Sequence, residues 1–125
     1  MDKKRILIID DENSIVKSTC MALEIYGFEA QGVLSGPEGI SAAREKRPDL
    51  ILLDIMMPGM DGWTVLGELK GDASTSGIPV IIFTAKEHPN GAATAKSRGA
   101  CDYVSKPFEP EELAGIIRKH LSEGA

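Results

Sequence analysis

The hydrophobic residues of this chain fall into short runs that are separated by longer amphipathic segments. The runs occur at Arg5–Ile9, Glu29–Val33, Leu50–Leu53 and Val80–Phe83, with a shorter one at Tyr103–Val104. Runs of four or five residues that do not alternate with polar ones are typical of strands buried on both faces of a parallel sheet. The pattern therefore predicts five strands in one sheet.

Segments of helical period lie between these runs. The first segment has apolar residues three and four positions apart and reaches Gly27, a residue type that commonly ends helices. Two further helices are expected from Pro37 to Lys46 and from Asp61 to Lys70, each with one apolar face. The inward face of the first helix is predicted to consist of Ile15, Thr19, Ala22, Leu23 and Tyr26.

The last two helices are predicted to differ in how firmly they are held. The segment from Ala92 to Arg98 follows the turn sequence Pro89-Asn90-Gly91 and has no large apolar side chain. It is expected to be short or loosely held, because little apolar area is available to anchor it. The fifth helix has Pro110 near its start, acidic residues in its first turn and basic residues near its end, as the helix dipole favours.

Alternation of strands with helices predicts the fold class. Right-handed crossovers between parallel strands place helices on both faces of the sheet, which gives a three-layer α/β sandwich. The chain has 125 residues, a common size for one domain. We therefore expect residues 1–125 to form a single domain.

Composition and charge exclude several kinds of partner. A net charge of −5 argues against a general nucleic-acid-binding surface, which would be basic. No apolar stretch is long enough to cross a membrane, and no signal peptide follows Met1, so a cytoplasmic protein is expected. Cys20 and Cys101 lack metal-binding neighbours, and two buried free thiols are favoured over a disulfide or a metal site.

Polar residues stand where four of the predicted strands end. Asp10 and Asp11 follow the first strand and Asp54 follows the third, while Thr84 and Lys106 follow the fourth and fifth. Functional residues of parallel α/β sheets gather at the carboxyl ends of the strands, near the point where the strand order reverses. These five residues are therefore expected to line one edge of the sheet.

The charges at this edge predict a bound metal ion. Three carboxylates and one lysine sum to −2, which one divalent cation would balance. The ligands are oxygens, so Mg²⁺ is favoured over zinc, which prefers His and Cys. A metal ion beside Asp54, with Lys106 and Thr84 nearby, suits phosphoryl transfer in which Asp54 attacks phosphorus.

Each of these residues also has a plain structural explanation. Asp11 or Asn13 could cap the first helix, and Thr84 could cap the fourth. A lysine such as Lys106 is usually a solvated surface group. The occurrence of a carboxylate, a hydroxyl and a lysine at successive strand ends favours a functional site over independent accidents.

The motifs at these positions resemble the receiver domain of two-component response regulators over essentially the whole chain. The resemblance implies a flavodoxin-like, doubly wound (βα)5 fold with strand order 2-1-3-4-5. It rests on Asp10-Asp11-Glu12, on the run from Pro48 through Asp54-Ile55-Met56-Met57-Pro58-Gly59-Met60-Asp61-Gly62, on Thr84-Ala85, and on Gly99-Ala100-Cys101-Asp102-Tyr103-Val104-Ser105-Lys106-Pro107-Phe108.

The same resemblance implies the chemistry of the site. Asp54 would accept a phosphoryl group from the phosphohistidine of a sensor histidine kinase or a histidine phosphotransfer protein. Asp11 would bind Mg²⁺ directly, Asp10 would act mainly through water, and the backbone carbonyl of Met56 would be a further ligand. Lys106 would pair with Asp54 and then with the phosphoryl group, and a cis peptide bond would follow it.

The resemblance also implies a switch instead of an enzyme that acts on external substrates. Thr84 would move toward the phosphoryl group and Tyr103 would rotate inward, although Tyr103 could also be a half-buried aromatic without that role. This motion would remodel the fourth helix, fifth strand and fifth helix as the output face for a downstream effector domain or protein. The chain would act as a monomer or a phosphorylation-dependent dimer.

Two other functional classes share parts of this pattern. A Mg²⁺-dependent phosphatase of the haloacid-dehalogenase type would need a second Asp two residues after the nucleophile, where this chain has Met56. A flavodoxin-like flavin carrier would need a phosphate-binding loop after the first strand, where Asp10, Asp11 and Glu12 would repel a phosphate. Both are therefore less favoured than a receiver domain.

Two neighbouring positions bear on the lifetime of the phosphoryl group. Met56 cannot orient a water molecule by hydrogen bonding, and Lys86 could reach over an anionic phosphoryl group. We therefore expect slow self-dephosphorylation. Two alternatives are expected for the chain: a complete single-domain regulator, or one domain of a longer regulator.

Overall fold

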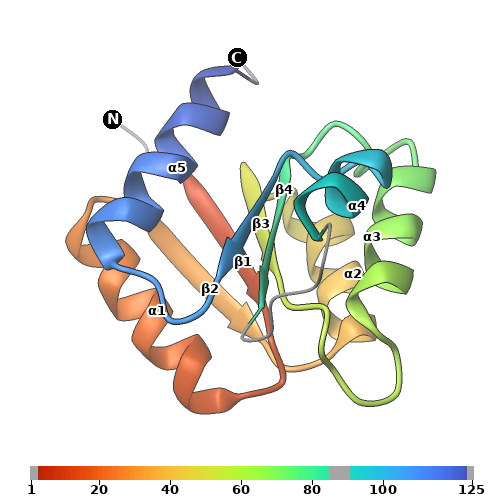
Figure 1. The fold of residues 1–125 in the computed structure, drawn as a ribbon, viewed down its shortest axis with the longest axis horizontal. Helices are drawn as coiled ribbons and strands as arrows, with labels where there is room; N and C mark the ends of the chain where they lie inside the picture. Colours follow the sequence, from red (N-terminus) through yellow and green to blue (C-terminus); the bar gives the residue numbers. More distant parts are fainter. Residues whose placement is uncertain (1–2, 85–90, 124–125) are drawn as a thin grey trace.

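A computed structural model describes residues 3–84 and 91–123 of the chain, in which strands alternate with helices (Figure 1). The predicted strands and helices are all present, and most boundaries agree to within two residues. The elements are β1 Arg5–Ile9, α1 Asn13–Ile25, β2 Glu29–Val33, α2 Gly36–Lys46, β3 Leu50–Leu53, α3 Gly62–Gly71, β4 Val80–Thr84, α4 Gly91–Ser97, β5 Asp102–Ser105 and α5 Pro110–Glu123.

The five strands form one parallel sheet with the order β2-β1-β3-β4-β5, as the resemblance implies. The order reverses at β1, since the chain leaves β1 for β2 on one side and returns to β3 on the other. In the register of β1 and β3, Ile9 lies opposite Leu53. The residues that follow these two, Asp10 and Asp54, are therefore neighbours at the carboxyl edge of the sheet.

Helices cover both faces of the sheet, which confirms the three-layer arrangement. In Figure 1, α1 and α5 lie on one side of the strands, and α2, α3 and α4 lie on the other. Successive residues of a strand point to opposite faces. Ile6 and Ile8 of β1 accordingly pack in the core beneath α1 and α5, whereas Leu7 and Ile9 pack in the core beneath α2 and α3.

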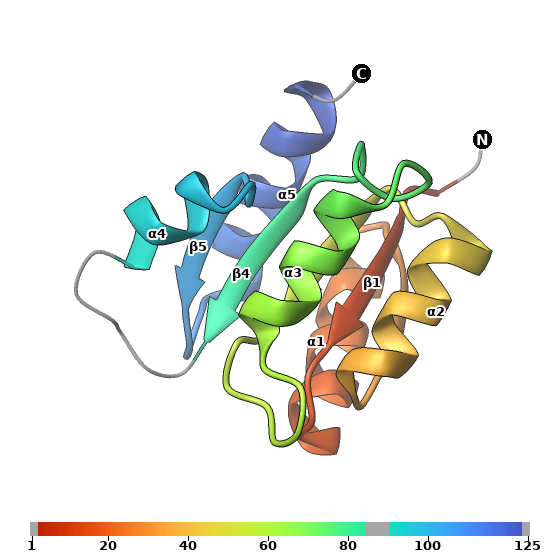
Figure 2. The same cartoon turned by 90° about the vertical axis from the view of Figure 1, so that its right-hand side faces the viewer.

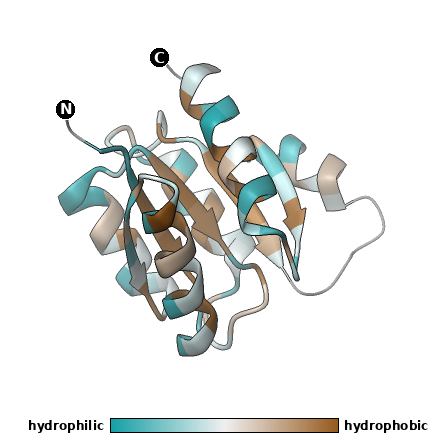
Figure 3. Ribbon diagram, turned by 90° about the vertical axis from the view of Figure 1, so that its left-hand side faces the viewer, coloured by the Kyte–Doolittle hydropathy of each residue, from teal (hydrophilic) through white to brown (hydrophobic). Residues whose placement is uncertain are grey.

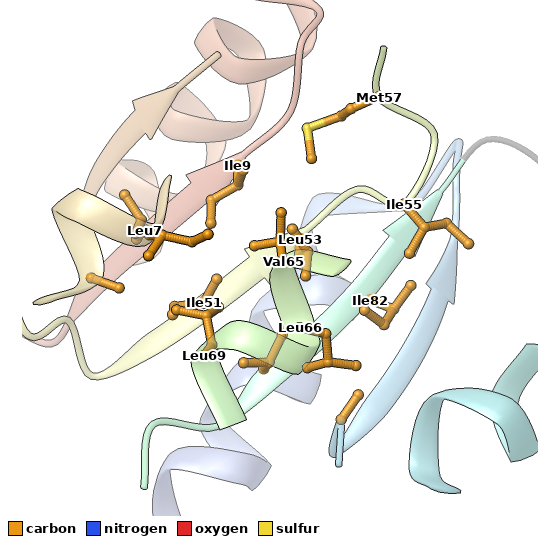
Figure 4. Close-up of a cluster of buried hydrophobic side chains, with 14 of the residues drawn as sticks. Leu7, Ile9, Ile51, Leu53, Ile55, Met57, Val65, Leu66, Leu69 and Ile82 are labelled. Atoms are coloured by element: carbon orange, nitrogen blue, oxygen red, sulfur yellow. The ribbon is translucent and has the colours of Figure 1, made fainter. Parts of the chain in front are cut away.

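The core beneath α3 shows how the sheet and the helices interlock. Figure 4 shows Val65, Leu66 and Leu69 of α3 lying over the apolar side chains of the central strands. Leu69 lies three and four positions after the other two, so all three share one face of the helix, and they are at most 1% exposed. The side chain of Asp61 accepts a hydrogen bond from the N–H of Thr64 at 2.9 Å and so caps the helix that carries them.

The two edge strands are less buried than the run pattern predicts. β1, β3 and β4 are buried almost throughout, whereas β2 and β5 are only half-buried. An edge strand has a neighbour on one side only, so its side chains are covered less completely. Figure 3 shows the brown, apolar strands of the sheet with helices that carry teal, polar residues around it.

The inward face of α1 is rotated slightly from the predicted one. Val16, Thr19 and Leu23 are the buried residues of this helix, while Ile15 and Tyr26 are only half-buried. Val16 packs directly on β2, where a Cβ atom at Gly32 would lie 2.0 Å from its Cγ1. The missing side chain at Gly32 is therefore what lets α1 approach the sheet at this point.

The remaining sequence expectations have mixed outcomes. In the part of α4 that the structure describes, only Gly91 and Ala95 are buried, which agrees with the prediction of a weakly anchored helix. Lys86 and the Pro89-Asn90 turn lie outside the described residues. Cys20 and Cys101 are half-buried and pack against the core cluster beneath α1 and α5, so they are less buried than expected.

Among the described residues, no helix has the length and apolar character that a membrane-spanning segment needs. The cytoplasmic location stays a prediction, as does the assignment of residues 1–125 to a single domain.

Candidate functional site

The polar residues that were predicted to converge do so at the carboxyl edge of the sheet. Asp10 and Asp54 follow β1 and β3, Thr84 is the last residue of β4, and Lys106 follows β5. Figure 2 shows the arrowheads of β1 and β4 pointing toward the same edge, where the connections to α1 and α3 run close together. The topology therefore brings residues that are up to 96 positions apart into one site.

Asp10 is buried and held by the backbone on both sides. Its N–H donates to the carbonyl oxygen of Val33 at 3.2 Å, and its Oδ1 accepts from the N–H of Glu12 at 2.9 Å. The structural alternative for the neighbouring residues is wrong: Glu12 is the N-cap of α1, and this cap has no side-chain hydrogen bond. Neither Asp11 nor Asn13 therefore caps the helix.

Asp54 is 3% exposed and has a fixed orientation. Its N–H donates to the carbonyl oxygen of Ile9 at 2.9 Å, and its Oδ1 accepts from the N–H of Met56 at 3.1 Å. The loop after Asp54 folds back closely, since a Cβ atom at Gly62 would lie 2.4 Å from the Asp54 carbonyl oxygen. Gly62 is needed for this close approach. Met56, in the same loop, lies on the surface and is 50% exposed.

Lys106 reaches from the end of β5 to both carboxylates. Its Nζ donates to Oδ2 of Asp10 and lies 3.7 Å from Oδ2 of Asp54. Its own N–H donates to the carbonyl oxygen of Thr84 at 2.8 Å, and the peptide bond to Pro107 is cis, as the resemblance implies. The resemblance implied Asp54 as the partner of this lysine, whereas the structure has Asp10 as the closer one.

Thr84 has a buried hydroxyl group with no hydrogen-bond partner among the described residues. The alternative role as a helix cap is therefore not supported. An unpaired buried hydroxyl costs free energy, so its retention needs an explanation such as a ligand that binds there. The position of Thr84 beside the acidic residues is consistent with that explanation.

Tyr103 is half-buried and packs against the core cluster beneath α2 and α3. A Cβ atom at Gly91 would lie 2.8 Å from the Cζ atom of the Tyr103 ring, so the ring is in close contact with α4. This contact joins β5 to α4 through one aromatic side chain. The switching role of Tyr103 and the ligand role of the Met56 carbonyl stay predictions.

Three carboxylates of the site fit a divalent metal ion. One oxygen each from Asp10, Asp11 and Asp54 can be chosen so that the three lie within 4.8 Å of one another. All three are hard oxygen ligands, and two of the residues are buried, which suits Mg²⁺. The donor set and its spacing therefore agree with the predicted cofactor.

Burial and charge act in opposite directions on Asp54. Burial raises the pKa of the Asp54 carboxyl group, and the negative charges of Asp10 and Asp11 raise it further. The N–H of Met56 and the ammonium of Lys106 lower this pKa, but the net shift is upward. The protein groups around Asp54 therefore do not fully offset the cost of burying its negative charge.

Phe83 is a component of the site that the sequence patterns did not reveal. Its ring centroid lies 4.5 Å from Nζ of Lys106. The available signal was an aromatic residue directly before Thr84 at the end of a strand. Strand alternation places two such neighbours on opposite faces of the sheet, but the path of the lysine across the ring depends on the folded loop.

Comparisons with known proteins agree with this geometry. Residues 6–118 match the family described as the response regulator receiver domain. The chain is 40% identical over 119 residues to the DNA-binding response regulator MtrA of Mycolicibacterium smegmatis, covering 95% of this chain and 51% of that protein. It is 38% identical to Protein PilH of Pseudomonas aeruginosa, covering 94% of this chain and 98% of PilH.

Solved structures show the same fold. A CheY-like response regulator receiver domain protein from Methanospirillum hungatei superimposes with a TM-score of 0.90 at 30% identity, covering 98% of this chain and 97% of that one. The chemotaxis protein CheY4 of Vibrio cholerae gives 0.87 at 26% identity, covering 94% and 98%. The chain therefore belongs to the response regulator receiver family of two-component signalling domains. It spans about half the length of the MtrA relatives.

Proposed function

We propose that this receiver domain takes a phosphoryl group onto Asp54 from the phosphohistidine of a sensor histidine kinase or a histidine phosphotransfer protein. In this reaction an Asp54 carboxylate oxygen forms a bond to phosphorus. The phosphorus–nitrogen bond of the donor breaks, and its electron pair stays on the imidazole. The observation that carries the proposal is the convergence of Asp54, Lys106 and the unpartnered hydroxyl of Thr84 at one edge of the sheet.

Asp10, Asp11 and Asp54 would hold Mg²⁺, with the Met56 carbonyl as a further ligand. The bound ion would supply positive charge that offsets the repulsion between these carboxylates and the incoming phosphoryl oxygens. The spacing of the three carboxylates supports the choice of Mg²⁺, as does the fact that the metal-binding cluster found among residues 3–84 and 91–123 contains neither His nor Cys.

Lys106 and Thr84 would respond to the change of charge on Asp54. The Lys106 ammonium would pair with a phosphoryl oxygen, since it already lies between the two buried carboxylates. Phosphorylation replaces the single charge of Asp54 by roughly two, which leaves the metal-loaded site with an excess negative charge. The Thr84 hydroxyl would donate a hydrogen bond to the phosphoryl group and so gain the partner that it lacks.

The output surface would be formed by α4, β5 and α5. Movement of Thr84 toward the phosphoryl group would change the packing of Tyr103, whose ring contacts the described start of α4. The recipient would be a downstream effector domain or protein, and the chain would be a monomer or a phosphorylation-dependent dimer. The MtrA relatives are named as DNA-binding response regulators, and this chain covers about half of their length. Their DNA binding is not assigned to this receiver domain in the proposal.

The direct test is incubation with acetyl phosphate and Mg²⁺, followed by intact mass measurement. We expect one added phosphoryl group, its loss at alkaline pH, and no addition when the metal ion is chelated. Labelling that does not depend on a divalent metal ion would contradict the metal site. The same preparation tests the two less favoured classes, because steady release of phosphate from a generic phosphoester would indicate a phosphatase, and yellow colour on purification a flavin carrier.

A further inference from the structure

Phe83 lies beneath the charged end of Lys106, on the opposite face of β4 from Thr84. The residue is fully buried and belongs to the core cluster beneath α1 and α5. Its ring centroid lies 4.5 Å from Nζ of Lys106 and 6.2 Å from the ring centroid of Phe108, with the two rings tilted by 50°. The lysine therefore ends over an aromatic face that the core holds rigidly.

The environment of the ammonium group is incomplete without this ring. The Lys106 side chain is 9% exposed, so its Nζ has lost most of its hydration. Within the described chain, its ion-pair partners are single oxygens of Asp10 and Asp54. An ammonium has three N–H donors, and the negative face of an aromatic ring attracts a desolvated cation at this distance.

We propose that Phe83 is the positioning residue of Lys106, holding its ammonium between Asp10 and Asp54 by a cation–π interaction. A free lysine side chain samples many rotamers, and a fixed ring that attracts its end reduces that freedom. The consequence for catalysis rests on the proposed function, since Lys106 must meet the phosphoryl oxygens as they arrive. The contact itself, with Nζ 4.5 Å from the ring centroid, is separate from that function and can be measured without phosphorylation.

The main alternative is that Phe83 only fills the core. Phe28 is a matched control for this alternative, because it is also buried in the same cluster and its ring lies 5.5 Å from the guanidinium of Arg118, away from the acidic site. A role in packing would make the two phenylalanines equivalent. A role in positioning would make only Phe83 sensitive to the electron density of its ring.

Fluorinated phenylalanines at position 83 test this difference, since fluorine withdraws electron density from the ring and changes its shape little. The first readout uses the metal-free chain. Lys106 Nζ is followed by ¹⁵N NMR, and its ammonium protons are expected to exchange with water faster with each added fluorine. The second readout is the rate constant for phosphorylation at saturating Mg²⁺ and acetyl phosphate, which should fall by about tenfold across the series. The apparent Mg²⁺ affinity should not fall.

The same series at Phe28 should leave both readouts unchanged. If fluorination at Phe83 changed neither the exchange of the Lys106 protons nor the phosphorylation rate, the positioning role would be overturned. If the exchange changed but no phosphoryl group were ever added to the wild-type chain, the proposed function would fail while the contact between Phe83 and Lys106 stood.

A double-mutant cycle gives a second test that does not need phosphorylation. The free energy of unfolding is measured for Phe83→Leu, Lys106→Met and the double variant in metal-free buffer. We expect Phe83→Leu to cost less stability when Lys106→Met has already removed the ammonium. Equal costs in the two backgrounds would show that the ring only fills the core.

Discussion

The amino and carboxyl edges of the sheet treat their buried and half-buried polar groups differently. At the amino edge, the N–H of Arg5 donates to Asp49 at 2.7 Å, and Nε2 of His120 lies 2.8 Å from an oxygen of Asp102. These groups join neighbouring elements in local pairs. Their arrangement is what stability alone would favour.

At the carboxyl edge, the carboxylates of Asp10, Asp11 and Asp54 cluster, and the ammonium of Lys106 pairs with two of them, those of Asp10 and Asp54. One buried hydroxyl, that of Thr84, has no partner among the described residues. Two of these carboxylates, Asp10 and Asp54, are also the most deeply buried acids that the structure describes. Such an arrangement is costly unless a ligand completes it. The contrast indicates that the polar pairs of the amino edge serve folding, whereas those of the carboxyl edge fit the metal ion and the phosphoryl group of the proposed function.

Replacing one Asp by Asn at each edge should give the largest difference in phosphoryl labelling. Asp54→Asn removes the oxygen nucleophile, and we expect complete loss of the phosphoryl label from acetyl phosphate. Asp102→Asn changes an acid at the amino edge, and the label should stay close to the wild-type level. Intact mass measurement of both variants checks this pair. Retained labelling in Asp54→Asn would disprove the central assignment.

Two buried threonines allow the same contrast to be measured as stability. Thr75 donates from Oγ1 to the carbonyl oxygen of Leu69 at 2.6 Å, whereas Oγ1 of Thr84 lacks a partner within the described chain. Thr75→Val should lower the free energy of unfolding by about 1–2 kcal/mol, because it leaves a carbonyl without its donor. Thr84→Val should leave stability unchanged or raise it by roughly 1 kcal/mol.

Urea denaturation in metal-free buffer measures both values. The two substitutions should have the opposite order of effect on function. Thr84→Val is expected to weaken the conformational response to phosphorylation, whereas Thr75→Val is expected to leave it unchanged. A loss of stability in Thr84→Val as large as that in Thr75→Val would indicate that the Thr84 hydroxyl is satisfied in solution.

The pH dependence of stability should have opposite signs at the two edges. Burial raises the pKa of Asp54, so its contribution to stability is present below the ordinary Asp pKa and is lost as pH rises through the raised value. Burial alone would raise the pKa of Asp102, but hydrogen bonds from His120 and the Tyr103 N–H hold it below its usual value. That contribution is present above the ordinary Asp pKa and is lost as pH falls through the lowered value.

At neutral pH without Mg²⁺, Asp54→Asn should therefore raise the urea midpoint and Asp102→Asn should lower it. Below the ordinary pKa of Asp both differences should shrink. Denaturation series at neutral and acidic pH check the two signs, and Mg²⁺ should stabilise the wild type more than Asp54→Asn. A lower midpoint for Asp54→Asn at neutral pH would mean that its ion pair with Lys106 outweighs burial and repulsion.

Sequence patterns predicted most of the fold because they depend on local spacing. Unbroken apolar runs predict the three central strands, and the rule for parallel sheets predicts that Asp10 and Asp54 lie at one edge. The strand order itself came from the resemblance. The sequence pattern overestimated the burial of the edge strands β2 and β5. The number of strands that flank a given strand depends on the strand order of the sheet, which the residues of that strand do not encode.

The sequence did not reveal which residues the long side chains of the site contact. Lys106 lies closer to Asp10 than to Asp54, and its path over Phe83 depends on how the loop after β5 crosses the end of β4. The turn of α1 that buries Val16 likewise depends on Gly32, a residue on another element. Contacts of this kind are set by tertiary packing, which leaves no periodic trace in the sequence.

The smallest expected effect concerns a surface residue at the carboxyl edge. Met56 is 50% exposed and follows Asp54 by two positions, with its N–H already bonded to the Asp54 carboxylate. An amide in place of the thioether could orient a water molecule toward the phosphoryl group, so Met56→Asn should shorten the phosphoryl lifetime several-fold. Because the backbone contact is kept, phosphorylation by acetyl phosphate should stay near the wild-type rate.

Loss of label after removal of the donor measures the lifetime, and Met21→Asn on the exposed part of α1 is the control for an added surface amide. A dephosphorylation rate of Met56→Asn no faster than that of the wild type would mean that the side chain at this position does not control access of water.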